Sequence, residues 1–187
     1  MRKLLLLCFL VIARTSSAEV TENLVYTSYV ANADPTRPLL STLNASSPYR
    51  QSSQILHAYT NWHVNWNFRW FEKPDGKCRI SSVTTKLTGN IHLPKLVGAN
   101  STQGSQFEKY LSALRVHEQG HYSIGKEAAT AIDRKILSLG EMSSCKALEA
   151  AANDLGNRTI NEYKEKELRY DDSTAHGKTQ GAWLDGE

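Results

Sequence analysis

Two patterns of hydrophobic and polar residues divide the chain into a β part and a helical part. Residues 60–71 alternate strictly, with Trp, Val and Phe on one face and Asn, His and Arg on the other, and this predicts a half-buried strand. The turn sequence Lys73-Pro74-Asp75-Gly76 separates that strand from a run rich in Thr, Val and Ile over residues 78–87. These two runs should form an antiparallel hairpin. Residues 24–30 predict a further strand, and residues 91–94 close the β part.

After the β part, apolar residues recur three and four positions apart, which is the period of a helix. Ser105 and Glu108 have the spacing of a capping box, and Gly140 can end the helix, so a helix over residues 105–139 is predicted. Ser143 or Ser144 can cap a second helix, which should pack antiparallel to the first because the connection is short. Residues 170–177 show little periodicity and predict a loop.

The first 18 residues have the pattern of an export signal. Arg2 and Lys3 give a positive start, residues 4–13 are an apolar run, and Ser16-Ser17-Ala18 is a small-residue cleavage site. The apolar run of about ten residues is too short to span a bilayer, and no later run is longer. We therefore predict cleavage after Ala18, no integral membrane segment afterwards, and one secreted or periplasmic domain over residues 19–187.

Charge and cysteine content narrow the class further. The net charge of +3 includes two cations of the signal, so the mature chain is close to neutral, which argues against nucleic acid as a partner. Cys78 and Cys145 remain after cleavage. In an oxidising compartment such a pair is more often a disulfide than free thiols or zinc ligands. A monomer is expected.

The chemistry is concentrated in His117-Glu118-Gln119-Gly120-His121, which lies within the first predicted helix. Residues four apart lie one above the other on a helix, so His117 and His121 can bind one metal ion, while Glu118 lies about 100° around, near its open side. This His-Glu-x-x-His spacing is that of zinc metallopeptidases, in which the glutamate acts as general base toward a zinc-activated water. The alternative is two histidines packed on a helix face, which leaves Glu118 unexplained.

A catalytic zinc ion usually takes a third protein ligand, and the sequence offers several glutamates. Glu127 would lie about 240° around the helix from His121 and roughly 9 Å along it, too far for the same ion. Glu149 or Glu162 could reach the site from the antiparallel second helix, although Glu162 lies in a polar stretch typical of exposed charge.

The tail after the second helix offers the favoured third ligand. His176, beside Gly177 in a predicted loop, can fold back over the site. Asp171 or Asp172 could ligate instead, or orient a ligating histidine. Tyr170 or Tyr122 can donate a hydrogen bond to a developing oxyanion. The stripe of Trp62, Trp66 and Trp70 predicts core packing under the motif helix rather than a carbohydrate platform.

Together these features resemble a known group of proteins. The export signal, the Trp-rich strand, the two cysteines, the segment LSALRVHEQGHYSIG and the tail YDDSTAHGKTQGAWL resemble bacterial secreted proteins of unknown function predicted to be zinc-dependent proteases. The resemblance covers nearly the whole mature chain. It implies a zincin-like fold with His117 and His121 as zinc ligands and Glu118 as catalytic base, and it adds weight to His176 as third ligand.

The sequence therefore predicts an α+β, zincin-like fold, with a small antiparallel sheet packed on the long motif helix and a second antiparallel helix. The predicted function is a secreted zinc metallopeptidase acting on peptide or protein substrates, with Glu118 and Tyr170 as catalytic residues and His117, His121 and His176 as ligands of Zn²⁺. The alternative is a non-catalytic metal-binding or interaction module that uses the same helix site structurally.

Overall fold

The structure is a computed structural model that describes residues 18–51 and 54–184. The predicted export signal lies outside the described residues except for Ala18, where the first strand begins. The elements, in chain order, are β1 (Ala18–Asn32), α1 (Leu39–Ser46), β2 (Tyr49–Gln51), β3 (Gln54–Leu56), β4 (Tyr59–Glu72), β5 (Cys78–Val97), α2 (Ser101–Leu137), α3 (Cys145–Thr174) and the 3-10 turn η1 (Lys178–Gln180).

The main sheet has three strands in the order β1-β5-β4. β4 and β5 form the predicted antiparallel hairpin, whose turn is closed by Lys73 N donating to the Lys77 carbonyl at 2.8 Å. β1, however, pairs in parallel with β5, so the sheet is mixed and the prediction of an antiparallel sheet is wrong. Alternation along a strand does not show which neighbour it pairs with. Here β5 lies between β1 and β4, parallel to β1 and antiparallel to β4.

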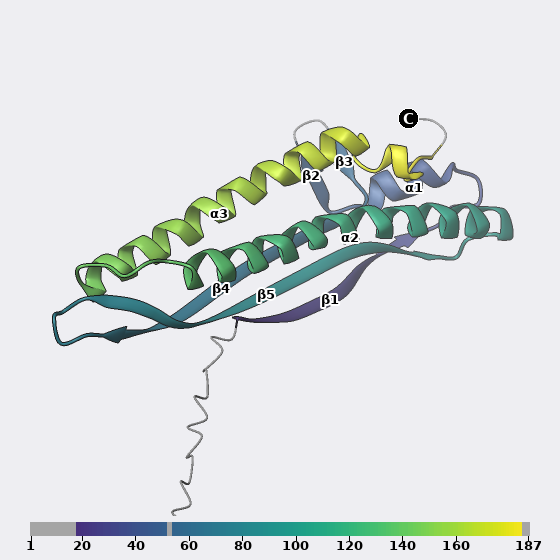
Figure 1. The fold of residues 1–187 in the computed structure, drawn as a ribbon. Helices are drawn as coiled ribbons and strands as arrows, with labels where there is room; N and C mark the ends of the chain where they lie inside the picture. The colour runs from purple at the N-terminus through teal and green to yellow at the C-terminus, as the bar shows by residue number, and fades with distance from the viewer. Residues whose placement is uncertain (1–17, 52–53, 185–187) are drawn as a thin grey trace, which may run out of the picture.

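The two long helices lie on one side of the sheet. α2 runs along the sheet and α3 returns beside it in the antiparallel direction (Figure 1), as the short connection predicts. The buried positions of β5, among them Val83, Leu87 and Ile91, alternate with exposed ones and join Ile132 and Ile136 of α2 in the core. The predicted α+β class is confirmed.

Two tryptophans of β4 fill the space between the sheet and the helices. Trp62 packs against Gly125 of α2, where an added Cβ would lie 2.7 Å from its ring. Trp66 packs against Gly156 of α3, where the corresponding distance is 2.5 Å. The core role predicted for these two rings is therefore confirmed, whereas Trp70 is 41 % exposed. Any larger residue at either glycine would push β4 and a helix apart.

The ends of the long helices differ from the predicted ones. α2 begins four residues before Ser105, because Asn100 and Gln103 form the capping box, with Gln103 N donating to Asn100 Oδ1 at 2.8 Å. Ser144 caps α3, as predicted, by accepting from Ala147 N. α3 continues through Thr174, so the first part of the predicted loop over residues 170–177 is helical. The helical form of residues 170–174 depends on tertiary contacts, which sequence periodicity does not show.

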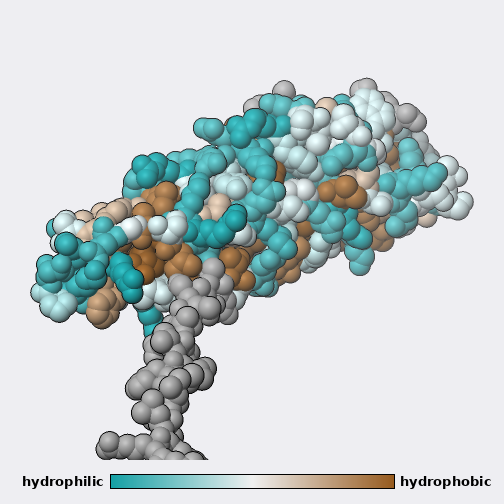
Figure 2. All heavy atoms as spheres, viewed as in Figure 1, coloured by the Kyte–Doolittle hydropathy of each residue, from teal (hydrophilic) through white to brown (hydrophobic). Residues whose placement is uncertain are grey.

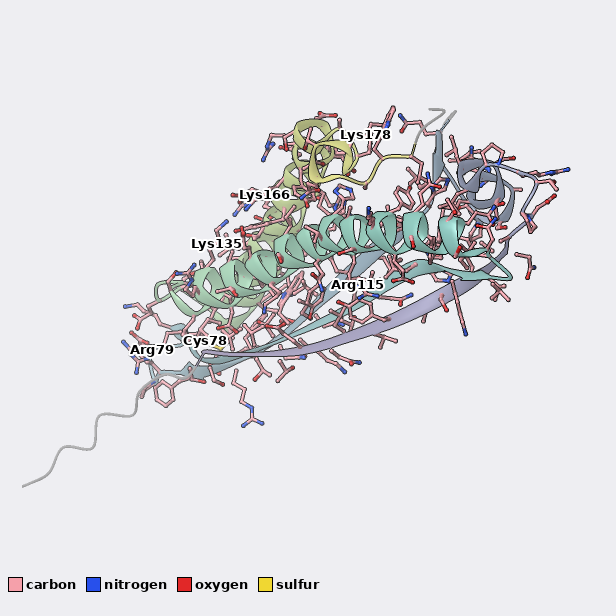
Figure 3. The ribbon with its side chains drawn as sticks, turned by 90° about the vertical axis from the view of Figure 1, so that its right-hand side faces the viewer. Cys78, Arg79, Arg115, Lys135, Lys166 and Lys178 are labelled. Atoms are coloured by element: carbon pink, nitrogen blue, oxygen red, sulfur yellow. A yellow bond between two sulfur atoms is a disulfide. The ribbon has the colours of Figure 1, made fainter. Side chains whose placement is uncertain are left out.

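A disulfide joins Cys78, at the start of β5, to Cys145, at the start of α3. The predicted pairing is thus confirmed. The backbone of Cys78 is also bridged to Met142, through two hydrogen bonds of 3.0 and 2.9 Å. Cys78 lies at one end of the molecule, and Lys178, which belongs to the turn after α3, lies toward the other end (Figure 3). The disulfide therefore fixes the beginning of α3 to the sheet, far from the tail.

One face of the molecule carries mainly polar residues. Figure 2 shows hydrophilic residues over most of one face, interrupted by separate apolar patches. Within residues 18–51 and 54–184, every helix is too short or too polar to cross a bilayer.

Removal of the disulfide should lower the free energy of unfolding by about 4 kcal/mol, because the bond closes a loop with a sequence separation of 67. The variant Cys78→Ser/Cys145→Ser, unfolded in urea, measures this change. Wild-type protein unfolded under reducing conditions is the matched control and should show the same loss. An unchanged midpoint in both would contradict a structural role for the bond.

Candidate metal centre

The two histidines of the helix motif face the same space on α2. His117 and His121 are one turn apart, and their Nε2 atoms lie 3.3 Å from each other. His117 is only 5 % exposed. The helical geometry of α2 thus places two imidazole nitrogens side by side, as the i, i+4 spacing predicts.

A carboxylate from α3 completes a group of three donors. Asp171 Oδ1 lies 3.3 Å from His117 Nε2 and 3.1 Å from His121 Nε2. Among the described residues, His117, His121 and Asp171 form the metal-capable group on these helices. Asp171 was an alternative to His176 in the sequence, and the geometry gives it the central position because the last turn of α3 is helical.

These distances fit a zinc ion. Two ligands at zinc bond lengths of about 2.0–2.1 Å and tetrahedral angles are roughly 3.3 Å apart, which matches the separations of 3.1 to 3.3 Å between the three donor atoms. Two imidazoles and a carboxylate are also the kinds of ligand that zinc takes in catalytic sites. The side chains therefore fit the ion.

Each histidine is held from behind by an oxygen acceptor. Glu167 Oε1 lies 3.3 Å from His121 Nδ1, and Gln180 Oε1 lies 2.9 Å from His117 Nδ1. Because carboxylate and amide oxygens only accept, each Nδ1 carries a proton and each Nε2 faces the proposed ion. Glu167 is fixed in turn by Trp62, whose Nε1 donates to the same oxygen at 2.7 Å.

Tyr170 braces this arrangement. Its ring stacks on that of His117 at a centroid distance of 5.1 Å, its hydroxyl donates to the His117 carbonyl at 3.1 Å, and Gln180 Nε2 donates to the hydroxyl at 3.0 Å. The hydroxyl lies against Gly120, where a Cβ would be only 2.0 Å away. The hydroxyl of Tyr170, the predicted oxyanion donor, is thus held against the α2 backbone beside His117.

The electrostatics of the cluster favour a cation. Burial lowers the pKa of His121, but its hydrogen bonds to Asp171 and Glu167 outweigh burial and raise the pKa to about 9. Burial would raise the pKa of Asp171, yet the hydrogen bonds to His117 and His121 hold it well below its usual range. The same negative charge that stabilises a protonated imidazole would stabilise a divalent ion.

Glu118 lies next to the donors but is held by a different element. It is 5 % exposed, and Thr60 of β4 donates from Oγ1 to Glu118 Oε2 at 2.6 Å. Burial raises the pKa of Glu118, while the Thr60 hydrogen bond and the two nearby histidines act to lower it. The carboxylate is therefore oriented by the sheet and not by the metal-capable group.

The three donors and Glu118 open into a cavity of about 700 Å³. One wall comes from β3 and the start of β4, the floor from α2, and the other wall from the end of α3 and the tail. A cavity of this size lies within the range of ligand-binding clefts. The site is thus accessible to a substrate rather than sealed in the core.

Comparison with known proteins assigns the chain to a family. Residues 26–177 match the model of a family described as "Bacterial protein of unknown function (DUF922)". The chain belongs to this family. Neither a curated protein nor a solved structure matches it. The DUF922 match extends from β1 to the residue after His176, and so covers both helices that carry the metal-capable group.

His176, the third ligand favoured by the sequence, lies at the rim of the same cavity in this DUF922 chain. Its Nδ1 is 3.6 Å from Asp171 Oδ1, and its side chain is 38 % exposed. The backbone after α3 turns sharply here, with φ of 53° at His176 and 85° at Gly177. A side chain at Gly177 would lie 3.0 Å from the His117 ring, so glycine allows the tail to close over that ligand.

The other candidates lie elsewhere. Tyr122 points to the sheet, where its hydroxyl donates to Glu22 at 3.1 Å, and burial with this contact raises its pKa to about 12. Glu127 pairs with Lys166, and Glu162 pairs with Lys135 at 2.9 Å. Glu149 and Asp172 are exposed. None of these five lines the cavity of the metal-capable group.

Sequence reasoning missed Glu167, Gln180 and Thr60. Glu167 and Asp171 are four residues apart on α3, so the same i, i+4 rule that pairs the histidines could have identified them. Gln180 and Thr60 carry no local signal. Each approaches α2 from a distant segment, and only tertiary structure brings it to the site.

Asp171→Ala should weaken zinc binding more than about 100-fold. Loss of a residue that only orients a ligand costs up to about 100-fold in affinity, and Asp171 is proposed to bind the ion directly. His176→Ala should change the affinity much less. Calorimetric titration of the metal-stripped variants measures both, and circular dichroism checks that each is folded. The reverse order of effects would make His176 the third ligand.

Glu167→Ala should weaken zinc binding about 10- to 100-fold, because His121 loses the acceptor that fixes its tautomer and ring orientation. Trp62→Phe is the matched control, since it removes the other partner of Glu167 and leaves the carboxylate in place. Equal losses in the two variants would show that packing rather than the hydrogen bond to His121 matters.

Proposed function

We propose that this protein is a zinc-dependent peptidase with a zincin-like arrangement of its motif helix and sheet. One observation carries the proposal. The Nε2 atoms of His117 and His121 and Oδ1 of Asp171 lie within 3.3 Å of one another, beside the buried Glu118 in an open cavity. Three protein donors and an adjacent carboxylate are the usual composition of a catalytic zinc site.

Each side chain has a definite task in the proposed reaction. A bound zinc ion lowers the pKa of water to about 7 and polarises a carbonyl group. Glu118 accepts the proton of the attacking water and passes it to the leaving amine. Thr60 holds one oxygen of the Glu118 carboxylate, and Glu167 and Gln180 hold the two imidazoles in register.

The exported location is part of the proposal. A disulfide between Cys78 and Cys145 is typical of an oxidising compartment. It agrees with the export signal predicted from residues 1–18. We therefore propose that the activity lies in the periplasm or outside the cell.

The alternative is a metal-binding module without catalysis. Structural zinc sites are usually closed by four protein ligands, whereas the metal-capable group of the described residues on α2 and α3 has three members and faces the cavity. This composition favours a catalytic site.

Glu118→Gln should reduce hydrolysis of a mixed peptide library at least 100-fold while leaving one zinc ion per chain, because it removes the proton acceptor but no ligand. Mass spectrometry of the cleaved library and metal analysis of the purified variant measure the two effects. The exposed Glu149→Gln serves as the control. Peptide hydrolysis that survives Glu118→Gln, or wild-type protein that binds zinc and cleaves nothing, would contradict the proposed function.

A further inference from the structure

The geometry points to an extended polypeptide segment with large apolar side chains as the ligand of the cavity, selected by an inner pocket around Leu114. The reaction assumed in this inference rests on the proposed function. The class of ligand is inferred from the shape and lining of the cavity.

Large apolar side chains are exposed on both walls at the mouth. Leu168 of α3 is 61 % exposed, and Ile55 of β3 and Tyr59 of β4 are 37 % and 42 % exposed. All three line the cavity of the metal-capable group. Exposed apolar groups that face one another across a cleft gain burial when an apolar ligand enters. The mouth therefore favours a ligand with apolar groups.

The inner pocket lies beyond Glu118 in the direction of the N-terminus of α2. Leu114 is one helical turn before Glu118 and lines the cavity with Leu56, Ala58 and Ala182 from three other segments. Leu114, Ala58 and Ala182 are each no more than 6 % exposed. An apolar pocket adjacent to the proposed general base would hold the side chain next to the bond that is cut.

A polar cluster lines the same cavity beside these apolar residues. His57 is buried, with Tyr110 Oη 2.6 Å from its Nδ1 and Asn44 Oδ1 2.7 Å from its Nε2, and all three residues line the cavity. The polar groups of the three side chains are thus hydrogen-bonded to one another. A leucine or phenylalanine side chain thus fits the description better than a charged one, which would need a partner of opposite charge there.

The length of the cavity argues for a polypeptide rather than a small molecule. Along α2 its lining runs from Tyr110 to His121, about 16 Å at 1.5 Å per residue. An extended chain covers that length with roughly five residues. Such a segment would lie between the β3 and β4 side of the cavity and the side formed by α3 and the tail, which carries Lys178 (Figure 3).

Two probes test the inference independently of each other. The first is a set of internally quenched peptides that differ only in the residue after the scissile bond, which is Gly, Leu, Phe or Glu. We expect kcat/KM for Leu and Phe to exceed that for Gly and Glu at least tenfold, within the range for filling an apolar pocket. The second is a set of peptide hydroxamates with the same side chains, whose binding to zinc-loaded protein is measured by calorimetry. It requires no turnover.

Matched variants connect the preference to the pocket. Leu114→Ala should lower the Leu-over-Gly ratio at least fivefold, and Leu111→Ala on the same helix, which does not line the cavity, should leave the ratio unchanged. Leu168→Ser at the mouth should weaken binding of the leucyl hydroxamate, and Val116→Ser, which is 52 % exposed outside the cavity, should not. Leu168 is exposed, so its replacement cannot unfold a core and serves where Leu114→Ala does not fold.

The outcomes separate the two proposals. Tighter binding of the leucyl than the glycyl hydroxamate without any peptide cleavage would overturn the peptidase function and support the ligand class. Cleavage of all four peptides with equal kcat/KM, or equal binding of all hydroxamates, would overturn the ligand class. A preference for the Glu peptide would overturn it as well.

Discussion

The antiparallel contact between α2 and α3 is the constraint on which the site depends. α2 supplies both imidazoles, but the carboxylates that fix and complete them, Glu167 and Asp171, come from α3. Glycine makes this approach possible at Gly120, against Tyr170, as it does for the tryptophans of β4 at Gly125 and at Gly156. The contact between Gly120 and Tyr170 leaves no space for a Cβ. A larger residue at Gly120 would therefore shift α3 and separate Asp171 from the histidines.

α3 is fixed at its two ends by different interactions. At its start, the disulfide and the backbone bridge between Cys78 and Met142 tie it to β5. At its end, Tyr170 reaches the His117 carbonyl, and Gln180 joins Tyr170 to His117 Nδ1. At the end far from the candidate site, the disulfide fixes α3 to the sheet covalently. A hydrogen-bonded network suits the site, because its donors and acceptors set tautomers as well as positions.

The sequence predicted what periodicity determines. The β4–β5 hairpin, the two long helices, the pairing of the histidines and the burial of Trp62 and Trp66 follow from local repeats, and the structure has them. Strand order did not follow, because alternation in β1 does not identify β5 as its parallel neighbour. Thr60 and Gln180 were also beyond reach, since each joins the site across more than 50 residues of chain.

The end of α3 decides where the two candidate ligands Asp171 and His176 lie. If the chain left α3 before Tyr170, Asp171 would lie in a loop with no fixed relation to Glu167. The structure keeps residues 170–174 helical, so Asp171 stands one turn after Glu167 on the face toward α2. Positive φ at Ala175 and His176 then ends the helix, and the histidine comes to lie beside Asp171 at the rim. The aspartate is held by α3, whereas the histidine is held only by the turn, so the proposed ligand Asp171 has the more rigid support of the two candidates.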